Sequence, residues 1–140
     1  MYDVTPITDG RETDCGAVAL KMLLEYYGQD IPLDTLIADC NITVAGCSGL
    51  DIINAGKKYG LDMVAFSMDA EELIEQDRPA IVWWLYHHWI VFCGQDDNGF
   101  IVICNPSKGR YRMTKGLFKS YYSGVSIWNG EPQPVEEEGE

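Results

Sequence analysis

Three side chains have the chemistry of a nucleophile, a base and an orienting group. Cys15 stands between Asp14 and Gly16, where a long apolar segment begins. In the first turn of a helix, unpaired N–H groups and the helix dipole can lower a thiol pKa from about 8.5 to roughly 3.5–7.5. As the N-cap residue, Asp14 should accept hydrogen bonds from backbone N–H groups through its carboxylate. Such a position can supply a thiolate nucleophile, whereas the default interpretation of a single cysteine is a small buried core residue.

A thiolate nucleophile needs a base, and the two histidines of the chain are adjacent, His87 and His88. They open the run His-His-Trp-Ile-Val, which reads as a β-strand, so only one of the two side chains should reach the helix. The common alternative for a histidine in a strand is a structural role. Asn105 ends the next expected strand, one hairpin after His88, and is placed to orient an imidazole.

Helices must position the first of these residues. Residues 14–28 are apolar except for one narrow polar stripe, a pattern that predicts a buried central helix ending at Gly28. A short helix is predicted over 33–40. A third should begin at the capping-box sequence Ser48-Gly-Leu-Asp51 and run to about Tyr59.

Strands must position the other two. After a strand at 61–68 and a polar surface helix at 70–76, short β-branched and aromatic runs alternate with turn residues. These runs predict strands at 80–85, 88–94, 100–104, 111–114 and 126–128. Helices followed by an antiparallel sheet predict an α+β fold.

Length and charge limit the organisation of the chain. Its 140 residues suit one domain, expected at 1–128. The net charge is −12, but the segment 129–140 holds five glutamates and no Lys or Arg, so the rest carries −7. We expect this segment to be a disordered, solvated acidic tail. A negative body argues against nucleic acids and anionic membranes as partners, since both need cationic surfaces.

Cysteine usage indicates a reducing compartment. The odd number of five cysteines, without a CxxC motif or a secretory signal, argues against a disulfide framework. No apolar run approaches the roughly 20 residues of a membrane helix, so a cytoplasmic protein without membrane insertion is expected. Two adjacent histidines match no zinc-ligand spacing, so a structural metal is not expected.

Taken in order, these motifs resemble a known family. Asp-Cys-Gly, then His-aromatic-Ile-Val, then a strand ending in Asn-Pro-x-x-Gly is similar to the bacteriocin-processing peptidases, the C39 group of papain-like cysteine proteases. The segments 26–28, 46–50 and 55–61 add to the resemblance, which covers about residues 6–128. It implies a papain-like α+β domain, with a buried N-terminal helix carrying Cys15 and a C-terminal antiparallel sheet carrying His88 and Asn105.

The resemblance also implies roles. Cys15 would be the nucleophile, and His88 the base, since His88 and not His87 directly precedes the aromatic-Ile-Val run. Asn105 would be the third member, where the family more often has Asp. The implied reaction cleaves a leader-type peptide after small residues, typically Gly-Gly, through a thioester and without a cofactor.

One position departs from the family pattern. The family usually has Gln six residues before the cysteine to hold the oxyanion, and here that residue is Asp9. A carboxylate would repel the oxyanion, and losing such a donor costs about 10²–10³ in rate. Either backbone N–H groups of Cys15 and a neighbour such as Gly16 form the oxyanion hole, or the activity is weak or lost.

Aromatic residues flank the expected histidine strand. Alternation places Trp84, Tyr86 and His88 on one face, with Trp83 and Trp89 on the other. Core packing explains such a set by default. The alternative is that Trp84 or Tyr86 walls a narrow substrate cleft, which suits a preference for small residues.

The resemblance implies partners, and two alternative functions stay open beside the peptidase. In the family this domain often precedes the membrane and ATP-binding parts of a transporter, so an ABC-type exporter is an expected partner besides the peptide substrate. A catalytically degenerate peptide-binding module of the same fold is the main rival. A thiol amidase or transferase acting on a non-peptide substrate is another.

Overall fold

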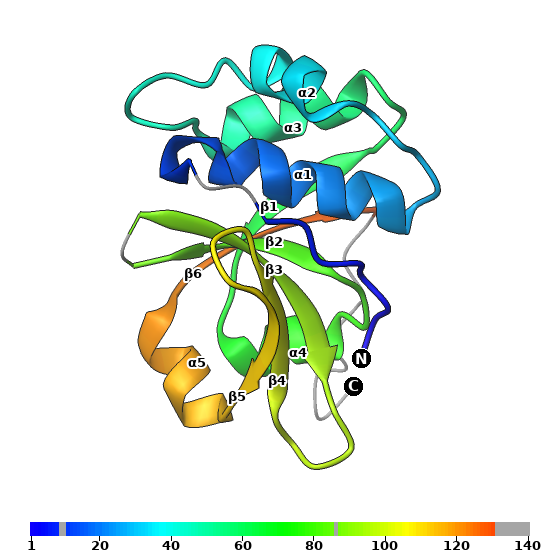
Figure 1. The fold of residues 1–140 in the computed structure, drawn as a ribbon. Coiled ribbons are helices and arrows are strands. Elements are labelled where there is room, and N and C mark those ends of the chain that lie inside the picture. The colour runs from blue at the N-terminus through cyan, green and yellow to red at the C-terminus, as the bar shows by residue number, and fades with distance from the viewer. Residues whose placement is uncertain (9–10, 86, 131–140) are drawn as a thin grey trace.

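Three helices cover one face of a six-stranded sheet in the computed structural model, which describes residues 1–8, 11–85 and 87–130 (Figure 1). A 3₁₀ turn, η1 (Glu12–Asp14), leads directly into α1 (Cys15–Tyr26). Helix α1 packs on the sheet, and α2 (Leu33–Asp39) and α3 (Gly49–Lys57) pack against it. Nine of the twelve residues of α1 are buried, as its narrow polar stripe predicts.

The sheet is antiparallel throughout. Its strands are β1 (Met63–Ser67), β2 (Ala80–Trp84), β3 (His88–Gln95), β4 (Ile101–Asn105), β5 (Gly109–Met113) and β6 (Tyr122–Asn129). Their order is β1-β6-β2-β3-β4-β5. Strands β2 to β5 form a meander, while β6 returns across the sheet to lie between β1 and β2.

Each face of the sheet has its own apolar core. Trp89, Val91 and Cys93 of β3 belong to the core shared with α1, whereas Ile90 and Phe92 belong to the core on the opposite face. Helices α4 (Ala70–Glu75) and α5 (Lys115–Tyr121) contribute to that second core and lie on the opposite side of the sheet from α1 (Figure 1). This arrangement confirms the predicted α+β fold, and the side chains of β3 alternate between the two cores.

The second half contains more structure than expected. Helix α5 was not predicted, and β6 begins at Tyr122 instead of 126. Thr114 caps α5 by accepting the N–H of Leu117 at 3.2 Å, and Phe118 buries its ring in the second core. A seven-residue helix has little stability of its own, so this tertiary burial is what holds it.

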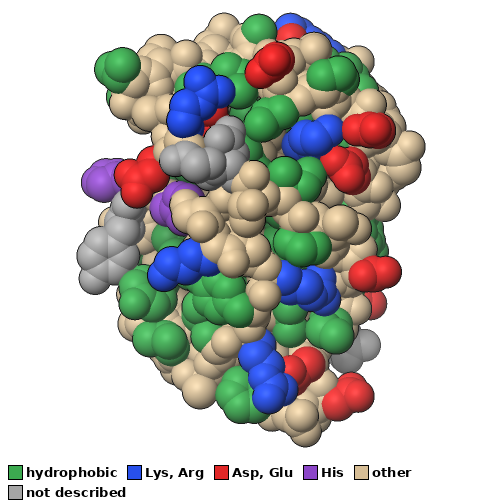
Figure 2. Space-filling view, in the orientation of Figure 1, with side chains coloured by type: hydrophobic (Ala, Val, Ile, Leu, Met, Phe, Trp, Pro, Cys, Tyr) green, Lys and Arg blue, Asp and Glu red, His purple; other side chains and the backbone are tan. Residues whose placement is uncertain are grey.

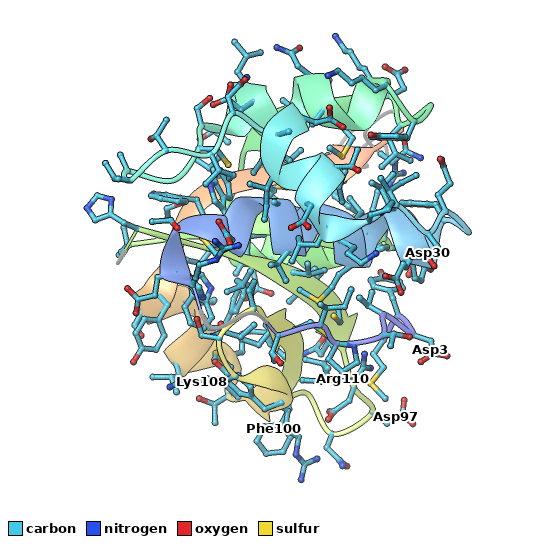
Figure 3. The ribbon with its side chains drawn as sticks, turned by 45° about the horizontal axis from the view of Figure 1, so that its top comes forward. Asp3, Asp30, Asp97, Phe100, Lys108 and Arg110 are labelled. Carbon is cyan, nitrogen blue, oxygen red and sulfur yellow. The ribbon has the colours of Figure 1, made fainter. Side chains whose placement is uncertain are left out.

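Both ends of the described chain are tied to the sheet. Tyr2 N–H donates to the Cys93 carbonyl at 2.7 Å, and the guanidinium of Arg110, labelled in Figure 3 beneath the N-terminal segment, donates to the Val4 carbonyl at 2.9 Å. Strand β6 runs to Asn129, one residue past the predicted domain boundary. The acidic run at 131–140 lies outside the described residues, so its disorder stays a prediction.

Within those same described ranges, no helix has both the length and the apolar character needed to cross a bilayer.

Candidate active site

Cys15 is the first residue of α1 and is 5% exposed. Its neighbour Asp14 does not cap the helix through its side chain, contrary to expectation. Asp14 is the last residue of η1, and its buried carboxylate pairs with Arg11 Nε at 2.8 Å instead. The 3₁₀ turn also occupies the backbone N–H of Cys15, which donates to the Glu12 carbonyl.

Burial dominates the acidity of the nucleophile candidate. Desolvation raises the pKa of the Cys15 thiol above its ordinary value, while the backbone N–H groups of Trp89, Gly16 and Cys15 itself act in the opposite direction. The expectation that a helix start alone would lower this pKa is therefore wrong, because the cost of an ion in a desolvated position exceeds the gain from nearby dipoles. A thiolate at neutral pH requires a base.

Gly16 has a packing role beside the thiol. A Cβ atom at Gly16 would lie 2.4 Å from Cys47 Sγ and 3.2 Å from Trp89 Cδ1. The sulfur of Cys47 therefore lies over the residue that follows Cys15. Sequence reasoning missed Cys47, although its place in the sequence Gly-Cys-Ser-Gly marked a loop before α3.

His88 and Asn105 form a hydrogen-bonded pair. His88 begins β3, Asn105 ends β4, and their Nε2 and Oδ1 atoms are 2.7 Å apart. Asn105 is 4% exposed, its Oδ1 also accepts the N–H of Ser107 at 2.9 Å, and its Nδ2 donates to Tyr111 Oη at 3.1 Å. Since Oδ1 can only accept, His88 Nε2 must donate, which leaves Nδ1 of the neutral ring as a proton acceptor.

His87 is held differently from the way the sequence suggested. It precedes β3, has a positive φ of 59°, and donates its backbone N–H to the Trp84 carbonyl at 3.1 Å. Strand alternation therefore does not relate the two histidines, because only His88 belongs to the strand. The His87 ring is exposed and meets Trp83 edge-on, and both histidines reach the surface on the same side of the molecule (Figure 2).

Two adjoining cavities divide the site. The first, of about 180 Å³, has Cys15 and Cys47 among its walls, together with Trp83 and Trp89. The second, of about 500 Å³, has His88 and Asn105 among its walls, and Glu12 and His87 line both cavities.

The structure brings Cys15 to the start of β3. The backbone N–H of Trp89, the residue that follows His88, lies against the Cys15 thiol. Among the described residues, no hydrogen bond joins the Cys15 thiol to the His88 ring. The structure therefore assembles the histidine–asparagine pair and places the thiol at the adjoining cavity.

The other site candidates have different outcomes. Trp84 lines the second cavity, is 7% exposed, and stacks on Tyr121 with ring centroids 5.0 Å apart. Its ring also meets His88 edge-on at 6.5 Å. Asp9 and Tyr86 lie outside the described residues.

Solved structures share this fold. A double glycine motif protease from an AMS/PCAT transporter, in complex with the leader peptide, superposes with a TM-score of 0.86 at 26% identity, covering 91% of each chain. The peptidase domain of Streptococcus ComA superposes with a TM-score of 0.84 at 24% identity, covering 93% of this chain and 99% of that chain.

Curated proteins are similar over the same region. A lactococcin transport/processing ATP-binding protein of Lactococcus lactis is 31% identical over 124 residues, and the colicin V secretion/processing ATP-binding protein of Escherichia coli is 26% identical over 128. These alignments cover 84% and 89% of this chain but only 17% and 18% of the two relatives. The model of one peptidase family matches residues 3–132, nearly the whole chain. The chain therefore belongs to the Peptidase C39 family.

Proposed function

We propose that this chain is a cysteine peptidase domain that cleaves a leader-type peptide after small residues such as Gly-Gly. In this proposal Cys15 is the nucleophile, His88 the general base and acid, and Asn105 the residue that orients His88. The observation that carries it is the 2.7 Å contact between His88 Nε2 and Asn105 Oδ1, because this contact leaves Nδ1 as the basic nitrogen.

The reaction follows from these assignments. His88 Nδ1 takes the thiol proton, and the sulfur attacks the carbonyl carbon of the bond to be cut. The imidazolium then protonates the leaving amine, the C–N bond breaks, and a thioester to Cys15 remains. A water molecule, deprotonated by His88, attacks that thioester and releases the acid and the thiol.

The shape of the first cavity supports a preference for small residues. Its volume is about 180 Å³, and two indole rings, Trp83 and Trp89, stand in its walls with centroids 4.6 Å apart. Glycines fit such a space, because they bring only backbone to the thiol. Larger residues before the cut would collide with the tryptophan walls.

Partners and compartment follow by analogy with the relatives. Their names describe transport and processing, and the chain spans under a fifth of their length. We infer that the domain works with an ABC-type exporter on its cytoplasmic side. The five cysteines, all unpaired, fit that reducing compartment.

The test is cleavage of a synthetic peptide that contains a Gly-Gly site, followed by mass spectrometry. The wild-type protein should cut directly after the second glycine, and Cys15→Ala should not cut. Cys93→Ala is the matched control, since Cys93 is also buried but lines neither cavity. Binding without cleavage by the wild type would reject the peptidase in favour of a peptide-binding module, and turnover of non-peptide amides alone would reject it in favour of an amidase.

A further inference from the structure

We propose that the second cavity binds the part of the substrate that follows the cut, and that it accepts a large apolar side chain at the first position after the cleaved bond. The proposal rests on the proposed function, because it uses the direction in which a peptide must cross the site.

That direction is set by the general acid. The leaving nitrogen must lie within hydrogen-bond reach of the group that protonates it. His88 lines the second cavity and not the first, whereas Cys15 lines the first and not the second. The acyl half of the substrate therefore lies in the first cavity, and the chain beyond the leaving nitrogen continues into the second.

The second cavity has the volume and the walls for an apolar side chain. Its volume of about 500 Å³ is much larger than the roughly 180 Å³ of the first cavity. Besides the His88–Asn105 pair, the apolar side chains of Met113 and Leu117 line it. Trp84 and Tyr121 add a flat aromatic wall, because their rings stack at 19° to each other. Cavities of this size that combine an apolar wall with polar groups bind ligands with large apolar parts.

Leu117 is the apolar wall residue whose exposed surface a bound ligand would cover most. It lies in the first turn of α5 and is 47% exposed, although its backbone is fixed by the Thr114 cap. A single exposed leucine needs no explanation by itself. Here it faces a cavity beside the general acid, so a substrate side chain would cover apolar surface that is now exposed to water.

Charge does not select the occupant. Glu12 and Lys108 both line the second cavity, and Lys108, labelled in Figure 3, comes from the turn between β4 and β5. Among the described residues that line this cavity, the opposite charges of Glu12 and Lys108 cancel. Discrimination therefore falls to apolar contact.

Partitioning of the acyl-enzyme tests this cavity separately from the first. A Gly-Gly activated ester acylates Cys15, and an added amino-acid amide then competes with water for the thioester. The amine nitrogen attacks the carbonyl carbon, the C–S bond breaks, and the amine proton passes through His88 to the sulfur. Mass spectrometry of the amide and acid products gives the capture ratio.

Leucinamide and phenylalaninamide should capture the acyl group about fivefold more efficiently than glycinamide, the effect of burying roughly half of a leucine side chain. Leu117→Ser should remove most of this preference. Leu50→Ser is the matched control, because Leu50 is also exposed, at 65%, but lines neither cavity.

If the protein is acylated and hydrolyses the thioester, equal capture of the three amides would overturn this proposal. A preference that Leu117→Ser leaves unchanged would overturn it too. Failure of the wild-type protein to become acylated would instead overturn the proposed function.

Discussion

Asn105 Oδ1 accepts both the backbone N–H of Ser107, at 2.9 Å, and the Nε2–H of His88, at 2.7 Å. The backbone contact keeps the amide oxygen toward His88, and the amide oxygen keeps the proton on Nε2. One buried side chain thus determines which ring nitrogen is available as a base.

Alkylation should depend on His88. Burial raises the pKa of the Cys15 thiol, so its thiolate at pH 6–7 requires the imidazole. Iodoacetamide should modify wild-type Cys15 faster than the other cysteines. In His88→Ala, alkylation should be slow at pH 7 and should rise with a midpoint above the ordinary thiol pKa of about 8.5. His87→Ala should keep most of the wild-type rate.

Cys47 is the internal control for alkylation, since it lines the same cavity. A hydrogen bond with Cys40 and burial raise the pKa of the Cys47 thiol, so it should react slowly. Peptide mapping by mass spectrometry distinguishes the sites. If Cys15 reacts no faster than Cys47, the nucleophile is misassigned, and loss of reactivity in His87→Ala alone would identify His87 as the base.

Replacing the orienting amide by a carboxylate should change the pH profile. The carboxylate oxygens introduced by Asn105→Asp could accept from Ser107 and His88, and the Tyr111 hydroxyl can turn to donate. The added charge stabilises the imidazolium. The basic limb of the kcat/KM profile should therefore move up by about one pH unit.

Asn105→Ala is the comparison for that substitution, and it should lower kcat by about 10² or more, because the imidazole loses its orientation. An unmoved basic limb in Asn105→Asp would show that His88 does not carry the catalytic proton.

Gly16→Ala should be destabilising by about 1–3 kcal/mol, because the new methyl group meets Cys47 Sγ and the Trp89 ring. Cys47→Ala should restore much of the loss in the double variant. Gly116→Ala in α5 is the control: nothing lies within 4 Å of its added Cβ, so it should be neutral or stabilising by up to about 1 kcal/mol. Urea unfolding should be measured for the wild type, Gly16→Ala, the double variant and Gly116→Ala. Equal losses of stability in Gly16→Ala and Gly116→Ala would contradict the close packing of Cys47 and Trp89 on Gly16.

Asp9→Gln should raise turnover of a Gly-Gly peptide by about tenfold or more, since a well-placed donor is worth roughly 2.7–4 kcal/mol. The backbone N–H of Cys15 already donates to the Glu12 carbonyl, so a side-chain donor for the oxyanion matters more. A fall in kcat would show that Asp9 serves another purpose, and no change would indicate that backbone groups form the oxyanion hole.

Local signals in the sequence were sufficient for the elements that carry the site. The predicted capping box is present, with reciprocal Ser48–Asp51 hydrogen bonds of 3.0 and 3.1 Å. Gly28 ends the α1 segment with a positive φ of 90°. The hairpin between β3 and β4 is local too, so the spacing of His88 and Asn105 correctly predicted their contact.

Non-local features were beyond those signals. Helix α5 has an internal glycine, Gly116, and no acidic partner for its Thr114 cap, so its stability depends on burying Phe118. The insertion of β6 between β1 and β2 joins segments about 60 residues apart in sequence, and no local pattern encodes it. Cys47 reaches the site for the same reason, through packing of its loop over α1.

The most direct test of the account is to locate the acyl group. A Gly-Gly activated ester is mixed with the protein, the reaction is stopped with acid during turnover, and the digest is mapped by mass spectrometry. We predict the added mass of the acyl group on the peptide that contains Cys15, its release by hydroxylamine, and its absence in Cys15→Ala. Turnover without acylation of Cys15, or continued turnover by Cys15→Ala, would contradict the central claim.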